Sequence, residues 1–288
     1  MEPWPSQASS EPDDPRDYLR RVAELPDDAI ELAEAALRLA SLDRPQVSLE
    51  RYRHHISLLV RDTEEESRRT AFRADTLEAR IAALNHVLYA RYGYRGDSLH
   101  YDDLQNANLM RVIDRRRGLP VSLGILYIHV ARAQSWQIAG IHFPAHFMVR
   151  LEHKGKRAIV DPFNEGVVRE VSELREMLKS SHGEGAELTP AHYAPVGNRE
   201  VLMRLQNNLQ LRLAQAGESS RALAVVESML LFAPGEASLW YDAGAFNAKL
   251  GNLRAAIAAL ETFLERSAQD GAKHQAAALL QQLRARLN

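Results

Sequence analysis

Three polar residues of the sequence have the side-chain types that nucleophilic acyl transfer requires: Ser122, His146 and Asp161. A serine hydroxyl is a weak nucleophile until a neighbouring base takes its proton, and histidine is the side chain that most often does so. A carboxylate bonded to the imidazole holds the ring in the orientation that the reaction needs. These residues therefore predict a nucleophile, a base and an orienting acid, provided that the fold brings them together.

The elements expected around these residues suit that arrangement. The run PVSLGILYIHVARAQSW predicts an apolar helix with Ser122 in its first turn. His146 opens a near-alternating segment, 146–151, which predicts a strand, and Asp161 follows a second predicted strand over 157–160. A helix N-terminus also offers partial positive charge and free N–H groups to an oxyanion. A nucleophile there, beside a histidine and an acid on adjacent strands, is the papain or transglutaminase arrangement.

Each of the three residues also has a purely structural interpretation. Ser122 serves equally well as a helix cap, and His146 as a buried histidine whose ring nitrogens are hydrogen-bonded within the protein. Asp161 precedes Pro162, which is typical of a turn. Spacing alone leaves both interpretations open.

Composition excludes several other kinds of site. Among 288 residues there is no cysteine, which excludes a thiolate nucleophile and any cysteine-bound metal. With 36 Lys+Arg and 38 Asp+Glu, the formal charge of −2 argues against a nucleic-acid partner. His142 and His146 have a metal-like spacing, but Pro144 lies between them, and no glycine-rich phosphate loop is present. We therefore expect no metal and no cofactor.

The sequence predicts helices in the first third of the chain, after a short tail. Residues 1–16 are rich in proline and acidic residues, and we expect them to be disordered. Helices follow over 17–92, one of them starting at Asp27 and Asp28, and two more over 49–62 and 63–92. Because neither a signal-peptide pattern nor a long apolar run is seen, we expect a cytoplasmic protein without a membrane span.

A mixed section over 93–198 precedes a helical repeat over 199–288. Three residue pairs in the repeat are 34 positions apart: Gly217 and Gly251, Ala222 and Ala256, and Met229 and Phe263. This period is typical of tetratricopeptide repeats. It predicts two helix pairs and a capping helix, with turns at Gly217, near Pro234 and at Gly251. Because two repeats are few for a free solenoid, we expect them to dock on the preceding section.

Three ordered segments carry a family resemblance: VIDRRRGLPVSLGILYIHVA, FPAHFMVR and IVDPFNEG. In them the chain resembles the bacterial SirB family, which joins a transglutaminase-like core to tetratricopeptide repeats. The resemblance implies an α+β fold with a helical N-terminal section, a papain/transglutaminase-like core and C-terminal repeats. It also implies that Ser122, His146 and Asp161 occupy the positions of nucleophile, base and acid. Ala145 stands where the family pattern leads us to expect glycine.

Serine replaces the thiolate of transglutaminases at the nucleophile position. An alcohol is far less acidic than a thiol, so a site arranged for a thiolate does not automatically activate it. The sequence therefore favours a non-catalytic binding or regulatory protein, with a degenerate cleft and repeats that hold a peptide or protein segment. The alternative is an enzyme, a serine-dependent acyl transferase, amidase or protease.

The run Asp114–Arg115–Arg116–Arg117–Gly118 precedes the central helix. Its arginines offer either an anion or carboxylate site beside the cleft, or a structural pair with the aspartate. The sequence favours the structural pair, because arginines in a chain of balanced charge are weak evidence for an anionic partner.

Overall fold

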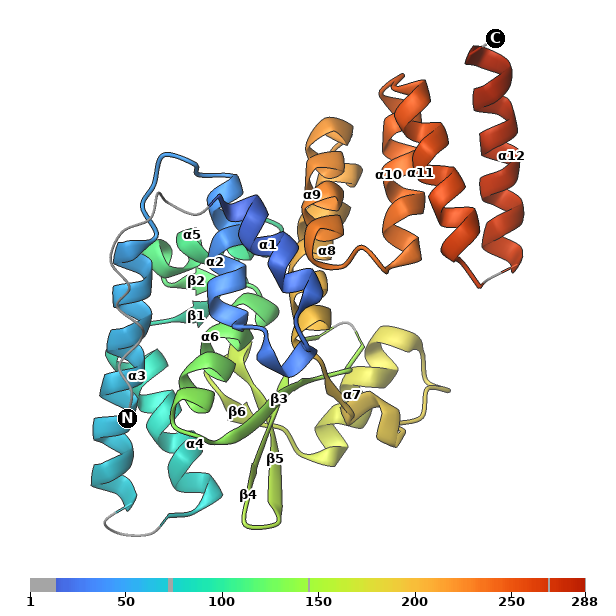
Figure 1. The fold of residues 1–288 in the computed structure, drawn as a ribbon. Helices are drawn as coiled ribbons and strands as arrows, with labels where there is room; N and C mark the ends of the chain where they lie inside the picture. Colours follow the sequence, from blue (N-terminus) through green and yellow to red (C-terminus); the bar gives the residue numbers. More distant parts are fainter. Residues whose placement is uncertain (1–13, 72–74, 145, 269, 288) are drawn as a thin grey trace.

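The computed structural model describes residues 14–71, 75–144, 146–268 and 270–287. It confirms the expected fold class: N-terminal helices cover a small sheet, and a row of C-terminal helices extends away from it (Figure 1). Most of the predicted tail, residues 1–13, lies outside the described residues. Its last residues are helical, since the first helix begins at Pro15 with the side chain of Asp14 as its cap.

The described residues of the N-terminal section form six helical segments: α1 (Pro15–Glu24), η1 (Asp27–Ala29), α2 (Leu32–Leu42), α3 (Glu50–Ala71), α4 (Leu77–Asn85) and the π-helical turn η2 (His86–Arg91). The prediction that one helix ends at residue 62 and the next begins at 63 is wrong. The helix expected to end at residue 62 is α3, which continues to Ala71. Helix α4 begins after Thr76, whose hydroxyl accepts a hydrogen bond from the amide of Ala79. Gly93 follows η2 with a φ of +69°, which confirms the predicted stop.

Asp27 and Asp28 do not start a long helix, as the sequence predicted. They form the short turn η1, and α2 begins only at Leu32. The carboxylate of Asp27 instead accepts hydrogen bonds from the backbone amides of Asn198 (2.6 Å) and Arg199 (2.9 Å). It therefore caps a helix more than 170 positions further along the chain.

The core section contains a five-stranded antiparallel sheet with the order β6-β5-β4-β3-β7. The two predicted strands are present, but β4 begins at Val149 rather than at residue 146. The turn between them is confirmed, with a positive φ at Lys154 and at Gly155. The strands are β3 (Gln137–Ile141), β4 (Val149–His153), β5 (Lys156–Asp161), β6 (Val167–Val168) and β7 (Pro195–Val196), beside the parallel pair β1 (Arg95–Gly96) and β2 (Arg117–Gly118).

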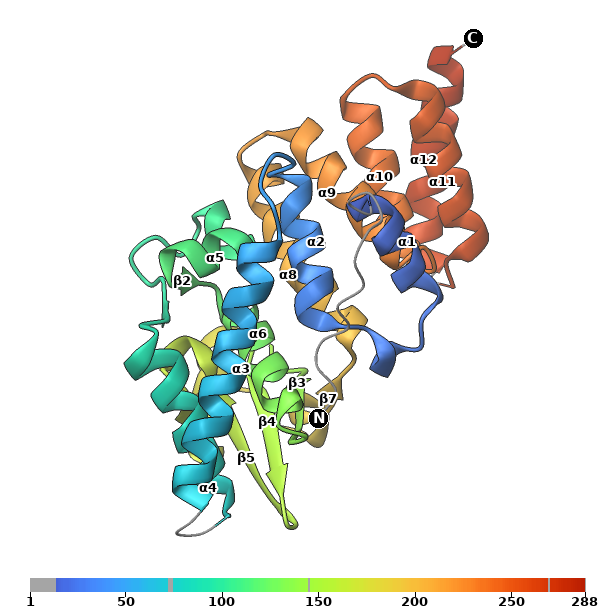
Figure 2. The same cartoon turned by 60° about the vertical axis from the view of Figure 1, so that its left-hand side comes forward.

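Helix α6 (Pro120–Ala133) is buried on nearly all sides. The other elements of the core section are the turns η3 (Leu104–Ala107), η4 (Pro162–Asn164) and η5 (Pro190–Tyr193) and the helices α5 (Leu109–Arg115) and α7 (Val171–His182). Helices from the N-terminal section, the sheet and the first repeat helix all pack on α6 (Figure 2). Any polar group on α6 must therefore find its partner inside the protein.

The C-terminal region consists of helices α8 (Asn198–Gln215), α9 (Ser219–Phe232), α10 (Ala237–Lys249), α11 (Leu253–Arg266) and α12 (Asp270–Leu287). This confirms the two helix pairs, the last helix and the three predicted turns. Gly217 and Gly251 have φ values of +76° and +79°, which explains glycine at both turns.

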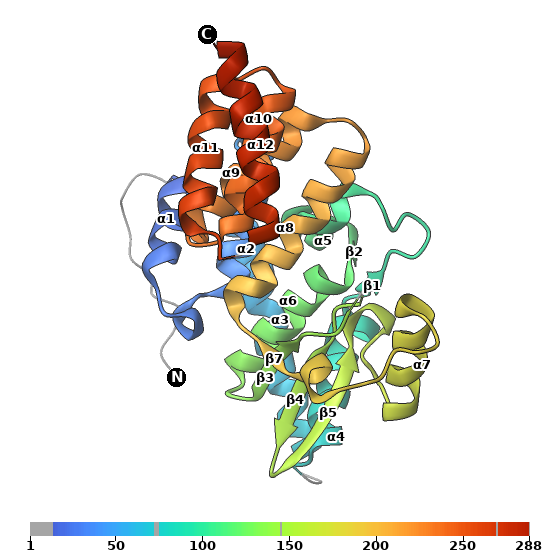
Figure 3. The same ribbon diagram turned by 90° about the vertical axis from the view of Figure 1, so that its right-hand side faces the viewer.

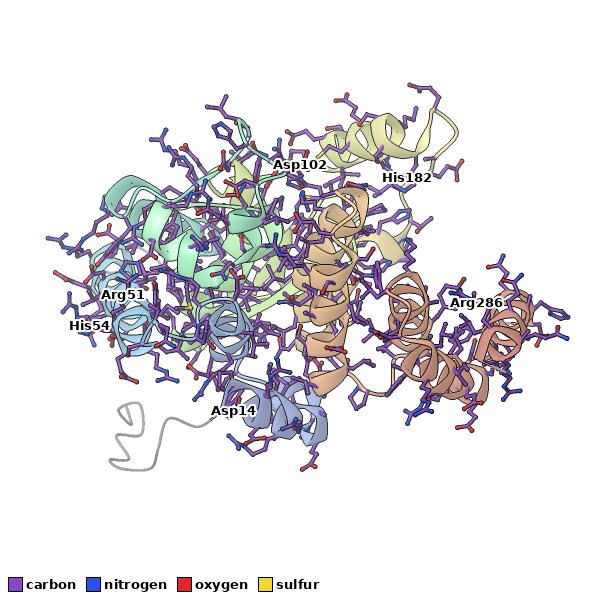
Figure 4. The ribbon with its side chains drawn as sticks, turned by 90° about the horizontal axis from the view of Figure 1, so that it is seen from above. Asp14, Arg51, His54, Asp102, His182 and Arg286 are labelled. Carbon is purple, nitrogen blue, oxygen red and sulfur yellow. The ribbon has the colours of Figure 1, made fainter. Side chains whose placement is uncertain are left out.

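The first repeat pair is part of the main hydrophobic core, as the expected docking requires. Buried residues of α8 and α9 belong to the same apolar cluster as α2 and α6, whereas most buried residues of α11 and α12 form a second, smaller cluster. In Figure 3, α8 lies between the sheet section and the remaining repeat helices. Seen from above, Arg286 on α12 lies at the opposite end of the molecule from Arg51 and His54 on α3 (Figure 4).

None of the described helices is both long and apolar enough to cross a bilayer.

The Asp27 cap offers a test of how the first repeat is attached. We expect Asp27→Ala to lower the free energy of unfolding by about 1–2 kcal/mol, because two amides at the start of α8 lose their acceptor. Urea unfolding would measure this. The matched control is Asp28→Ala, since Asp28 is exposed and makes no side-chain hydrogen bond to other described residues. Equal stabilities of the two variants would contradict the assignment.

A histidine on α6 makes the fold sensitive to acid. Burial, and secondarily the charge of Arg132, lowers the pKa of His129 from 6.5 to about 4. The unfolded chain therefore binds a proton first as the pH falls, and stability is lost between about pH 6.5 and pH 4, by less than about 1.4 kcal/mol per pH unit. We expect His129→Gln to weaken the fall in unfolding free energy between pH 7 and pH 5. Urea unfolding of both proteins at pH 7 and pH 5 would measure this, and an equal fall in the two would contradict the assignment.

Candidate functional site

The structure brings two of the three predicted site residues together. Nε2 of His146 lies 2.8 Å from Oδ1 of Asp161, which is the last residue of β5. The same Oδ1 accepts hydrogen bonds from the amides of Phe163 (3.1 Å) and Asn164 (3.4 Å), so the carboxylate also caps η4. Asp161 therefore does both things that the sequence indicated: its carboxylate stabilises the turn that follows it, and it binds His146.

The Asp161 carboxylate is completely buried but well supplied with donors. Its Oδ2 accepts from Nδ2 of Asn164 (2.7 Å) and from Nη2 of Arg169 (2.8 Å). Burial alone would raise its pKa, but the hydrogen bond and charge of His146, followed by the bonds from Asn164 and Arg169, lower the pKa of Asp161 to about 2. The carboxylate is therefore ionised near neutral pH and can hold the imidazole in place.

His146 lies in the segment before β4, three residues earlier than the strand, and not at the start of the strand as predicted. The next residue, Phe147, anchors this segment. Its ring occupies the space beside two glycines, since an added Cβ would come within 2.4 Å of the ring at Gly124 and within 2.7 Å at Gly140. The ring of His146 meets that of Phe163 edge to face, with centroids 6.0 Å apart. The imidazole is thereby held by a hydrogen bond to Asp161 and by the contact with Phe163.

The loop after Asp161 is held from the N-terminal section. The hydroxyl of Tyr89, in the π-helical turn η2, donates to the carbonyl of Pro162 (3.0 Å). Nδ2 of Asn85 donates to the carbonyl of Gly166 (2.9 Å). π-Helical turns are often found at functional sites, and here the turn places a side chain against the acid-bearing loop.

Ser122 lies in the first turn of α6, as predicted, but its hydroxyl is directed to backbone carbonyls. Its Oγ lies 2.8 Å from the carbonyl oxygen of Asn106 and 3.0 Å from that of Leu119. The side chain is fully buried, and Gly118 passes so close that an added Cβ there would lie 2.6 Å from Oγ. Among the described residues no hydrogen bond joins Ser122 to His146. The three catalytic roles therefore stay a prediction.

The parallel pair β1–β2 connects the two parts of the site. Gly118 of β2 lies against Ser122, and its partner Gly96 of β1 lies against Phe163, where an added Cβ would be 2.6 Å from the ring. Phe163 in turn contacts His146. The contacts thus run from the serine to the histidine through two glycines and one aromatic ring.

The arginines before α6 have structural partners. Arg115 donates to Oδ1 of Asn106 and to Oδ2 of Asp97, both at 2.9 Å, and Arg116 donates to the hydroxyl of Tyr94 (3.0 Å). Arg117 reaches the carbonyl of Arg116 at 3.3 Å. Asp114 binds Arg44, in the loop between α2 and α3, and Arg51 of α3, instead of the neighbouring arginines. The run therefore supports the local fold, although the predicted pair within it is not formed.

Sequence reasoning missed three residues that build the site: Asn106, Asn164 and Arg169. Asn164 is close to Asp161 in the chain, and an Asp-Pro-x-Asn turn could have suggested it. Asn106 and Arg169 are brought in by tertiary contacts and carry no local signal. Within the described residues, no group of three or more histidine or acidic side chains is arranged to hold a metal ion.

Comparison with known proteins shows relatives that share most of this chain. The UPF0162 protein of Vibrio cholerae is 30% identical over 246 residues, covering 85% of this chain and 89% of the relative. The UPF0162 protein of Xylella fastidiosa strain Temecula1 is 29% identical, with 85% and 86% covered. F-box only protein 21 of Mus musculus is 30% identical over 137 residues, or 45% of this chain and 21% of the relative. No solved structure gives a significant match.

Two family profiles match successive parts of the chain. A tetratricopeptide-repeat profile matches residues 209–284, which contain most of the predicted repeat. A profile described as transglutaminase-like superfamily matches residues 50–207, more than half of the chain and all of the candidate site. With this match and the bacterial relatives that cover 85% of it, the chain belongs to the transglutaminase-like superfamily.

Proposed function

We propose that this protein is a non-catalytic, SirB-like binding or regulatory protein. In this proposal the transglutaminase-like site is degenerate, and the repeats help to hold a peptide or protein segment in the cytoplasm. The presence of a transglutaminase-like domain and a tetratricopeptide repeat supports a protein-binding or regulatory role. The proposal includes no metal, cofactor or nucleic acid.

The state of the Ser122 hydroxyl carries the proposal. A nucleophilic hydroxyl must give its proton to a base, but the neighbours of this Oγ are two carbonyl oxygens, which only accept hydrogen bonds. Carbonyl oxygens also disfavour the negative charge that would develop on Oγ. Since the side chain is fully buried, a substrate carbonyl has no direct approach. The arrangement supports a structural use of the serine.

One observation favours the alternative, a serine-dependent acyl transferase, amidase or protease. The His146–Asp161 pair has the geometry of a base and its orienting acid, at 2.8 Å. Because Nε2 bonds to the carboxylate, Nδ1 is the nitrogen left to accept a proton. For catalysis, the Ser122 hydroxyl would have to leave its carbonyl acceptors and turn to Nδ1.

Labelling with a fluorophosphonate probe separates the two functions. We expect no labelling of wild-type protein above that of Ser122→Ala, because the hydroxyl is buried and bonded to carbonyls. The matched variant His146→Gln should not change the result. Mass spectrometry of the tryptic peptide containing Ser122 would detect any adduct. Labelling at Ser122 that disappears in His146→Gln would establish the alternative function.

A thiol introduced at the same position probes the environment without requiring activity. We expect Ser122→Cys, which creates the only thiol in the chain, to have a pKa above the ordinary value of about 8.5, since burial and two carbonyl oxygens disfavour a thiolate. The pH dependence of its reaction with iodoacetamide would measure this. A thiol introduced at an exposed position, as in Ser220→Cys, is the control. Fast alkylation at pH 7 that depends on His146 would contradict a raised thiol pKa and show that this position stabilises a thiolate.

A further inference from the structure

One face of helix α8 carries two arginines beside the loop that precedes η3. Arg204, Leu211 and Arg212 share this face, because they are separated by about two helical turns. Nε of Arg212 lies 3.1 Å from Oδ1 of Asp102, which is labelled in Figure 4. The guanidinium of Arg212 also lies over the ring of Tyr101, 5.4 Å from its centroid. We call Arg204, Arg212 and Tyr101 the basic patch.

Arg204 is the member of the patch whose charge has no acidic partner. Its Nη2 donates to the carbonyl of Phe143 (3.0 Å), and its guanidinium lies 5.5 Å from the ring centroid of Phe147. Within the described residues it forms no ion pair, since Glu200, one turn earlier, binds Nδ1 of His142 at 3.0 Å instead. A guanidinium has five N–H donors, so most of those of Arg204 have no acceptor in the protein. Burial lowers the pKa of Arg204, and an anionic neighbour would stabilise its charge.

The donors of Arg204 can be reached from outside the chain. Among the described residues, Thr63 Oγ1 and Arg150 Nε are the buried side-chain atoms that lack a partner. The unused N–H groups of Arg204 are therefore in contact with solvent. Tyr101 and Leu211 are 37% and 59% exposed, and the hydroxyl of Tyr101 makes no hydrogen bond to another described residue. The face thus offers hydrogen-bond donors and an apolar side chain together.

The charges of the patch define the class of ligand. Asp102 pairs with Arg212, which leaves the positive charge of Arg204 unbalanced. Burial raises the pKa of Tyr101, and the charges of Arg212 and Arg204 oppose this rise, so both arginines act at its hydroxyl. An anion with one charge matches one unbalanced cation, whereas a phosphate group carries about −1.5 to −2 near neutral pH. A carboxylate also fits the planar fork of a guanidinium.

We propose that the basic patch binds a carboxylate of a peptide segment of a partner protein, either a C-terminus or an Asp or Glu side chain. The carboxylate accepts hydrogen bonds from Arg204 and from the hydroxyl of Tyr101, and an apolar side chain next to it packs on Leu211. The ring of Tyr101 lies 5.7 Å from that of Phe163, which meets His146 edge to face, so the bound segment lies beside the transglutaminase-like site. The inference rests on the proposed function, since it gives the protein-binding role a location and a ligand class.

The test uses the full chain and a library of random peptides displayed on phage with their C-termini free. Peptides that are enriched on wild-type protein are synthesised, and their Kd is measured by fluorescence anisotropy. Amidation of the C-terminus, or exchange of Asp and Glu for Asn and Gln, separates the two sources of the carboxylate. We expect one of these changes to weaken binding to wild-type protein about tenfold, or by about 1.4 kcal/mol.

Three variants of the protein test the patch itself. Arg204→Gln should weaken the binding of acidic peptides about tenfold, because a charge-assisted hydrogen bond is lost, and should bind acidic and neutral peptides alike. Asp102→Asn should strengthen binding about threefold, because it removes the carboxylate that competes for Arg212. Arg254→Gln, which makes the same charge change at an exposed position of α11, should bind as wild type does.

Urea unfolding of the variants detects any loss of fold. Should Arg204→Gln lose stability, the comparison of acidic with neutral peptides and the Asp102→Asn variant, whose carboxylate is 87% exposed, still decide the question. If neutral peptides bind wild type as tightly as acidic ones, or acidic peptides bind folded Arg204→Gln as tightly as wild type, this inference fails while the protein-binding function stands. If no peptide is enriched, the inference and the proposed binding function both fail.

Discussion

The burial of the first turn of α6 is the constraint on which the rest of the site depends. A helix begins with amides that lack internal partners, and a buried helix cannot satisfy its polar groups with bulk water. The carbonyl of Asn106 meets this need twice, since it accepts from the Ser122 hydroxyl (2.8 Å) and from the amide of Leu119 (3.1 Å). The turn η3 supplies that carbonyl, and Arg115 binds the side chain of the same asparagine. The serine is thus one member of a satisfied buried network rather than a free nucleophile.

The need to give buried polar groups hydrogen-bond partners also determines the surroundings of Asp161, but there it leaves a histidine nitrogen free within the part of the chain that the structure describes. There the buried group is a charge, and among the described residues it accepts six hydrogen bonds, five from residues 163–169 and one from the imidazole of His146. The result is a histidine held in a fixed orientation, with one nitrogen still without a partner among the described residues. The chain therefore holds a histidine–aspartate pair in a fixed orientation, while the hydroxyl of Ser122 binds backbone carbonyls. A site can retain this geometry without activity, because the geometry also stabilises the loop that carries it.

The sequence predicted those features that depend on local periodicity or on one special residue. The repeat helices follow from a 34-residue period and from glycines that adopt a positive φ, and the hairpin follows from Lys154 and Gly155. What it missed depends on distant contacts. Strand β3 was not predicted, although it pairs with both β4 and β7, and Asp27 was assigned to the wrong helix because its amide partners lie at Asn198 and Arg199. The acid–base pair was predictable by residue type, whereas the carbonyl partners of Ser122 were not.

The turn η3 links the site and the repeats. Leu104, Gln105 and Ala107 line a cavity whose opposite wall is formed by α8 and α9. Asn106, between them, accepts the hydrogen bond from the hydroxyl of Ser122 on α6. The four residues of η3 thus contact both the cavity and the first turn of α6. A shift of this turn would therefore change the cavity and the surroundings of Ser122 together. Arg212 of α8 adds a second connection, because it pairs with Asp102 just before η3 and stacks on Tyr101, whose ring meets Phe163 beside His146. The first repeat is therefore a structural part of the transglutaminase-like section, because its contacts reach the residues that adjoin Ser122 and His146.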